Sequence, residues 1–154
     1  MQASPPATAR ETRLGQQLFE LFRRLTLDPE ADHLRAVEEL DLTLSQVRAI
    51  HMLACSDPEQ LSGGRIAERL GISPAATSRA LDALVNKGFV ARTESPEDRR
   101  VRLFAITVAG RAAAARLTAL KRAQLERFVA GLEPTQRETL SRALAELDLD
   151  GACS

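Results

Sequence analysis

The chain has 154 residues and carries 21 basic and 21 acidic side chains, so its formal net charge is zero. Ala, Leu, Arg, Glu and Lys make up just over half of it, a composition typical of mostly helical proteins that argues against a large β-sheet fold. With no Trp or Tyr and only five Phe, the chain is poorly suited to binding single strands or RNA by base stacking.

The first third of the chain predicts two amphipathic helices behind a short leader. Residues 1–11 are rich in Ser, Pro and Ala, so we expect them to form a disordered leader. They lack the apolar stretch of a signal peptide. Apolar side chains recur at helical spacing over residues 14–25. After an acidic segment over residues 33–41, Thr43 is a suitable N-cap for a second helix over residues 44–55.

The middle of the chain predicts a short helix, a turn and a second helix. Residues 66–70 carry apolar side chains on one helical face, and Gly71 ends this helix because glycine readily adopts the left-handed conformation. Ser73 can cap the next helix, which Pro74 opens and which runs to about residue 87. The apolar stripe of this second helix consists of Thr77, Leu81, Leu84 and Val85.

The apolar period then changes from 3.6 to 2. Residues 89–93 and 101–107 predict two short strands, and the polar segment between them predicts a hairpin loop. An Ala-rich helix follows to about residue 130, where Gly131 interrupts it, and Pro134 opens a last helix. One face of this last helix carries Leu140, Ala143, Leu144 and Leu147. No apolar run reaches the roughly 18 residues that a membrane span needs.

A short helix, a turn with glycine and a second helix are typical of a helix-turn-helix, whose second helix enters the DNA major groove. The face of residues 74–87 opposite the apolar stripe offers small side chains that allow close approach and one arginine able to reach guanine O6 and N7. A simply solvated helix face is the alternative. The candidate DNA-binding residues here are Ser73, Ala75, Ala76, Ser78, Arg79 and Asp82.

The predicted hairpin is the second candidate DNA contact. Its arginines are Arg99 and Arg100 at the tip and Arg92 and Arg102 on the strands. Exposed arginines on a loop suit phosphate contact or insertion into a narrow minor groove. Residues 61–103, which contain both candidates, are the basic part of the chain, with eight basic and five acidic side chains. Alternatively, Glu97 and Asp98 pair with these arginines in solvent.

The core of the sequence resembles the winged helix-turn-helix of the MarR family of bacterial transcriptional regulators, over the stretch LSGGRIAERLGISPAATSRALDALVNKGFVARTESPEDRRVRLFAITVAGR. In that family a helix similar to LTLSQVRAIHMLA precedes the core, and the wing carries an Asp-x-Arg signature, which here is Asp98-Arg99-Arg100 followed by Ile106-Thr107. The resemblance covers residues 12–148. It is specific in the core, whereas the terminal helices match in length and amphipathicity.

The resemblance implies a mainly α fold with a small β-hairpin wing, in which the winged helix-turn-helix core is flanked by N- and C-terminal dimerisation helices. It also implies a homodimer on a pseudo-palindromic operator in double-stranded DNA, because two recognition helices about one helical turn apart reach enough base pairs. In the alternative, the terminal helices pack within the monomer. The expected segments are a leader 1–11, dimerisation helices 12–42, a DNA-binding lobe 43–107, dimerisation helices 108–149 and a tail 150–154.

Members of the family commonly bind small aromatic or phenolic anions between the dimerisation helices and the DNA-binding lobe. By this resemblance the candidate effector-binding residues are Phe19, Phe22, Arg48 and His51.

We expect no enzymatic activity, cofactor or metal, since nucleotide-binding, hydrolase and metalloprotease motifs are absent from the sequence. His51 and Cys55 share a helical face, but zinc needs three or four ligands, and only His33 or acidic residues remain to complete the set. Cys55 follows Leu53 and Ala54, which favours a buried, inert thiol over a redox sensor.

The leading hypothesis is a cytoplasmic, sequence-specific, double-stranded DNA-binding regulator, a repressor released by a small molecule. The alternative is a helical protein-interaction module that uses the winged helix as a docking surface.

Overall fold

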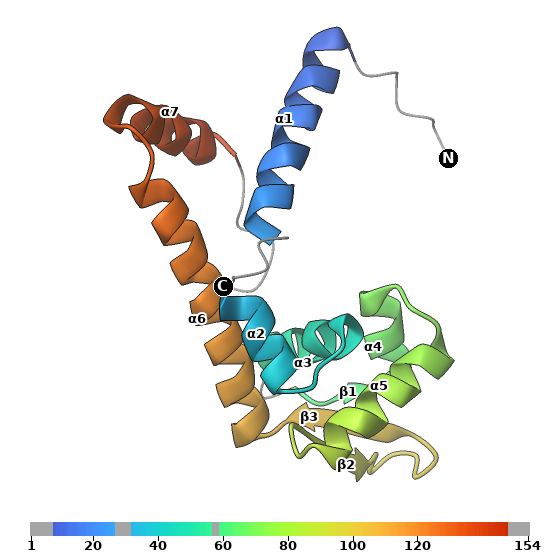
Figure 1. Ribbon diagram of the computed structural model, residues 1–154. Helices are drawn as coiled ribbons and strands as arrows, with labels where there is room; N and C mark the ends of the chain where they lie inside the picture. The colour runs from blue at the N-terminus through green and yellow to red at the C-terminus, as the bar shows by residue number, and fades with distance from the viewer. Residues whose placement is uncertain (1–7, 27–31, 57–58, 148–154) are drawn as a thin grey trace.

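The computed structural model describes residues 8–26, 32–56 and 59–147. They form a mostly helical fold with a small three-stranded antiparallel sheet. Figure 1 shows α2 to α5 and the sheet gathered in one lobe, from which α6 runs to α7 and α1 at the opposite end. The elements are α1 (Ala9–Thr26), α2 (Asp32–Glu39), α3 (Leu44–Ser56), β1 (Leu61–Ser62), α4 (Gly63–Leu70), α5 (Pro74–Asn86), β2 (Val90–Glu94), β3 (Arg102–Ile106), α6 (Val108–Ala130) and α7 (Pro134–Ala145).

The N-terminal helix starts earlier than the sequence pattern suggested. The hydroxyl of Thr8 accepts a hydrogen bond from the backbone N–H of Glu11, and the Glu11 carboxylate accepts one from the Thr8 N–H at 2.6 Å. This reciprocal capping satisfies two backbone donors and begins α1 at Ala9, inside the segment 1–11 expected to be a leader. Residues 1–7 and the expected tail 150–154 lie outside the described residues. No helix of the described part is long and apolar enough to cross a membrane.

The turn between α4 and α5 forms as predicted. Gly71 has a φ of 64°, the left-handed conformation that ends α4. The Ser73 hydroxyl accepts a hydrogen bond from the Ala76 N–H at 3.2 Å, and Pro74 occupies the first turn of α5. Local sequence signals therefore fix both ends of the turn.

The sheet has the strand order β1-β3-β2, with both pairs antiparallel. The hairpin of β2 and β3 confirms the two predicted strands, shifted by about one residue, and pairs Arg92 with Phe104 and Glu94 with Arg102. The sequence did not predict β1, because two residues are too few to show an alternating pattern. The pairing of β1 with β3 joins the start of α4 to the wing.

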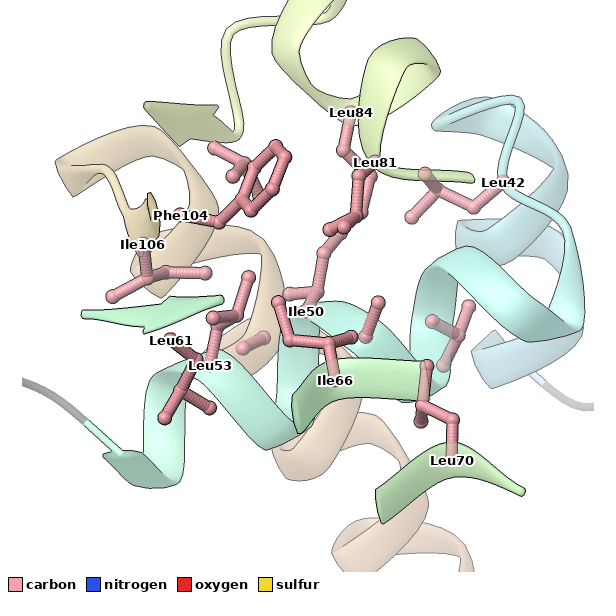
Figure 2. Packing of buried hydrophobic residues seen from close by; sticks show 14 of the residues in the cluster. Leu42, Ile50, Leu53, Leu61, Ile66, Leu70, Leu81, Leu84, Phe104 and Ile106 are labelled. Carbon is pink, nitrogen blue, oxygen red and sulfur yellow. The ribbon is translucent and has the colours of Figure 1, made fainter. Parts of the chain in front are cut away.

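The core lies where α3, α4, α5 and the sheet meet. Figure 2 shows Ile50, Ile66, Leu81 and Phe104 pointing toward one another, and each is buried. The base of the wing packs closely against α6, since a Cβ added at Gly110 would lie 2.1 Å from the Phe89 carbonyl oxygen. The lobe is thus one packed unit that includes the start of α6.

Candidate nucleic-acid interface

The buried stripe of α5 determines which side chains remain outside. Thr77, Leu81 and Leu84 are buried as predicted, and Val85 is half-buried. The opposite face therefore points away from the core. Of the residues proposed from the sequence, Ala76 is half-buried, and the exposed ones are Ser73, Ala75, Ser78, Arg79 and Asp82.

The wing tip carries exposed arginines on a loop that Asp98 shapes. The Asp98 carboxylate accepts a hydrogen bond from the backbone N–H of Arg100 at 2.9 Å, and its carbonyl accepts one from the Val101 N–H. Asp98 thus organises the backbone rather than pairing with a guanidinium. Within the described residues, neither Arg99 nor Arg100 forms an ion pair.

Glu97, the other acidic residue of the tip, also pairs within the loop. It accepts a hydrogen bond from the Ser95 hydroxyl at 2.6 Å, which lowers the pKa of Glu97. The idea that acidic residues neutralise the arginines at the tip therefore finds no support in the geometry.

The strand arginines behave differently. Arg92 lies 2.9 Å from Asp82 of α5, and Arg102 pairs with Glu94 across the hairpin. Asp82, one of the candidate DNA-binding residues, is exposed and also joins α5 to β2, which lies against it (Figure 1). In the described part of the chain, the charge of the wing is therefore divided between paired strand arginines and unpaired tip arginines.

A hollow of about 480 Å³ lies between α5, which is the predicted recognition helix, the wing and the start of α4. Its lining includes Ser62, Ser78, Asp82, Arg92, Arg102 and Phe104. Arg65, in the first turn of α4, is exposed and forms no ion pair among the described residues. The sequence analysis did not single out Arg65. Its place three residues after Ser62, the N-cap of α4, could have marked it as a candidate DNA contact.

A family model described as MarR family matches residues 40–101. The HTH-type transcriptional repressor Rv2887 of Mycobacterium tuberculosis is 32% identical over 142 residues, which cover 92% of this chain and 98% of the relative. The chain belongs to the MarR family.

Solved structures agree with membership of the MarR family. The structure of Rv2887, described as a MarR family protein of M. tuberculosis, has a TM-score of 0.64 at 29% identity and covers 90% of this chain and 95% of its own. Rv1404 from the same organism reaches 0.72 at 27% identity, covering 91% and 92%. A MepR–DNA complex from S. aureus shares the fold, with a TM-score of 0.62 at 18% identity and coverage of 88% and 99%.

Membership of the MarR family makes this protein a DNA-binding transcriptional regulator with a winged helix-turn-helix. The alternative of a protein-docking module is not favoured, because the chain matches the transcriptional repressor Rv2887 over nearly the whole length of that relative.

A second candidate site of this MarR-family protein lies between α3 and α6. Two hollows, of about 720 and 320 Å³, share His51, Thr118 and Arg122 in their linings. The smaller one adds His33 of α2 and Lys121. Partial burial lowers the pKa of both histidines, and for His33 the positive charges of Lys121 and His51 act in the same direction.

Only one of the four effector residues expected from the family lines these hollows. His51 does, whereas Phe19 and Phe22 are exposed on α1, and the Arg48 guanidinium donates to the Leu70 carbonyl at 2.7 Å. The sequence analysis missed His33, Lys121 and Arg122, because the hollows form between helices that are far apart in the sequence.

Cys55 is exposed at the end of α3, so the expectation of a buried thiol is wrong. A helix end exposes side chains that the middle of the same apolar helix would cover, which explains the error. In the described part of the chain, no three His, Cys, Asp or Glu side chains gather closely enough to hold a metal ion.

Proposed function

We propose that this protein is a sequence-specific transcriptional repressor that binds double-stranded DNA in the cytoplasm as a homodimer and is released by a small anion. The observation that carries the DNA-binding part is the position of three arginines that form no ion pair within the described residues. Arg79 on the recognition helix and Arg99 and Arg100 at the wing tip are exposed on neighbouring elements, so one duplex can contact all three. No enzymatic step and no cofactor form part of the proposal.

Apart from Asp82, which pairs with Arg92, each predicted DNA-binding residue receives a role from its position. Ser73, Ala75, Ala76 and Ser78 are small and let the start of α5 approach the base edges closely. Arg79 is placed to make a bidentate contact with guanine. The Asp98 turn presents Arg99 and Arg100 to the minor groove and its phosphates.

The dimer part rests on the apolar surface of the terminal helices. Leu18 is 57% exposed and Phe19 is 65% exposed on α1, and Leu144 and Leu147 are exposed at the other end of the chain. Figure 1 shows α1 and α7 projecting away from the lobe. Apolar patches of this kind mark interaction surfaces, and a second copy is the partner that places two recognition helices on one operator. The segments 12–42 and 108–149 are therefore proposed as the dimerisation regions.

The effector part rests on the hollows at His51. Lys121 and Arg122 supply positive charge, and His33 and His51 can gain it, while Leu125 and several alanines supply apolar surface. This combination suits a small aromatic carboxylate or phenolate. Benzoate is a suitable probe. It should release the protein from DNA, and Arg122→Gln should raise the benzoate concentration needed.

The DNA-binding proposal is tested by fluorescence anisotropy on short duplexes from the region upstream of the protein's own gene. With about 6–8 phosphates neutralised per dimer, a plot of log K against log salt should slope by about −5 to −7. A mixed-sequence duplex of equal length is the control and should bind more weakly. Affinity that does not change between roughly 50 and 200 mM salt contradicts the proposal.

A further inference from the structure

Asp82 is an acidic residue on a face that otherwise suits DNA. Its two carboxylate oxygens have different partners. Oδ1 lies 2.9 Å from Nη1 of Arg92 on β2, and Oδ2 accepts a hydrogen bond from the Ser78 hydroxyl at 3.4 Å, one turn earlier in α5. The side chains of Asp82 and Arg92 are about equally exposed, at 51% and 46%. The pair therefore bridges the recognition helix and the wing at the surface.

Two simpler roles for Asp82 do not explain this arrangement. A hydrogen bond from a cytosine amino group would use a remaining lone pair of the carboxylate, but it would not account for the pairing of Asp82 with Arg92. A purely stabilising role also falls short, because half-exposed ion pairs contribute little to folding stability.

The distribution of paired and unpaired arginines suggests a third role. Arg92 and Arg102, both lining the hollow beneath the wing, are paired with carboxylates. Within the described residues, Arg79 and Arg100 form no ion pair. The carboxylates thus engage the arginines on the wing strands and leave those on the recognition helix and at the wing tip unpaired within the described residues.

We propose that Asp82 limits the overall affinity of this protein for DNA, because it withholds Arg92 from the DNA phosphates while holding the wing against the recognition helix. This inference rests on the proposed DNA-binding function. An arginine freed in the hollow would add a phosphate contact on any sequence, because phosphate contacts carry no base information. Because this contact is the same on the operator and on other DNA, it would strengthen both complexes by a similar factor and would not improve discrimination between them.

The test uses the full-length protein with the Asp82→Asn substitution, which keeps the shape of the side chain and its bond to Ser78. Two duplexes are compared by anisotropy across a salt series. One is selected from a random pool by the wild-type protein, and the other is a mixed sequence of equal length. For the mixed duplex, affinity at low salt should rise about 3- to 10-fold, and the salt slope should steepen by about 2, since each dimer gains two phosphate contacts. Affinity for the selected duplex should rise by a similar factor, because the added contact is the same in both complexes.

Two matched variants distinguish a freed Arg92 from a general change in net charge. In the double variant D82N/R92Q the freed arginine is absent, so the wild-type salt slope should return. Glu59→Gln removes an exposed carboxylate that precedes β1, outside the proposed dimerisation regions, and should leave the slope unchanged. A steeper slope in Glu59→Gln would assign the effect to net charge and overturn the proposal.

Two further results would also count against it. A weaker affinity of Asp82→Asn for both duplexes with an unchanged slope would show that Asp82 has only a structural role. A changed preference at one base pair with unchanged binding to the mixed duplex would show that Asp82 contacts a base. A wild-type protein that selects no duplex from the pool would instead refute the DNA-binding function itself.

Discussion

The ammonium group of Lys87, at the end of the recognition helix, lies 2.7 Å from both the carboxylate and the backbone carbonyl oxygen of Asp41. Asp41 has a φ of 50°, a left-handed conformation that Asp tolerates better than most residues. The hydrogen bond from Lys87 lowers the pKa of Asp41. These contacts tie the C-terminal end of α5 to the turn after α2.

Lys87→Met should lower the free energy of unfolding by about 1–2 kcal/mol, because the Asp41 carbonyl loses its donor. The measurement is urea denaturation at fixed protein concentration, which keeps any dimer contribution constant. Asp41→Asn is the matched control. It keeps the carbonyl contact and the tolerated φ, so it should destabilise the protein less than Lys87→Met does. A larger loss for Asp41→Asn than for Lys87→Met would show that the carboxylate dominates this contact.

Gly110→Ala should destabilise the lobe strongly, by about 3 kcal/mol or more, since the new methyl group would meet the Phe89 carbonyl at 2.1 Å. Thermal unfolding monitored by circular dichroism measures the effect. Gly64→Ala is the control, because a Cβ there meets nothing within 4 Å, and alanine in a helix should be neutral or stabilising. Equal melting temperatures for the two variants would show that the wing base relaxes easily.

The two arginines of the DNA face should differ in what they contribute. Arg79→Ala should cost about 1–3 kcal/mol on the operator and relax the preference at one position of each half-site. Arg100→Ala should weaken operator and mixed DNA by similar factors, lose more where the flanks are A-tracts, and make the salt slope shallower by about one. Anisotropy on base-substituted operators compares them. Unchanged affinity of Arg100→Ala for every duplex means that the wing does not contact DNA.

Asp98→Ala should give a milder version of the Arg100 defect. Its carboxylate bonds to the Arg100 backbone, so removing it loosens the loop and leaves the guanidinium in place. The same duplexes and salt series serve for this comparison. A loss as large as that of Arg100→Ala would mean that the loop shape matters as much as the charge.

Leu18→Asp and Leu144→Asp should each weaken the homodimer by several kcal/mol, because dimerisation would bury an unpaired charge. Sedimentation velocity at micromolar concentration measures the assembly state. Leu44→Asp is the control. Leu44 is 75% exposed at the start of α3, outside the proposed interface, and should leave the dimer intact. A wild-type protein that sediments as a monomer contradicts the interface.

Stability should fall as the pH decreases below about 6.5, the ordinary pKa of histidine. Burial lowers the pKa of His33 and His51 in the folded protein, so the unfolded chain takes up these protons first and acid favours unfolding. Above that pH both states are neutral at these positions and the effect vanishes. Urea midpoints between pH 7.5 and 5 should show the decrease, and the double variant H33Q/H51Q should flatten it. An unchanged pH profile in that variant assigns the effect to other groups.

The local parts of the fold were predictable because each has its own signal. Gly71, Ser73 and Pro74 mark the turn of the helix-turn-helix, and the change to a period of 2 marks the wing. The two-residue strand β1 left no such signal. The structure also shows a capped helix at Thr8 and Glu11, where the composition of residues 1–11 predicts a leader.

The candidate sites were predictable only where one helix carries them. The stripe of α5 placed Arg79 and Ser78 on the outer face correctly. Pairs between elements, such as Asp82 with Arg92, depend on tertiary packing that no spacing in the sequence records. The same limit applies to the hollow that His33 and His51 share with Lys121, which three separate helices form.

The close contact between Gly110 and Phe89 makes α6 a lever arm. The Thr107 hydroxyl strengthens the joint, since it donates to the Gly88 carbonyl and accepts from the Gly110 N–H. With 23 residues, α6 is about 34 Å long, and the wing is fixed to one end while the proposed dimer contacts lie at the other. A tilt of about 5° at the far end would move the wing by about 3 Å, close to the rise of one base pair. A small tilt of α6 would thus change the spacing between the two recognition helices of the proposed dimer. The spacing would then no longer match the helical repeat of the operator.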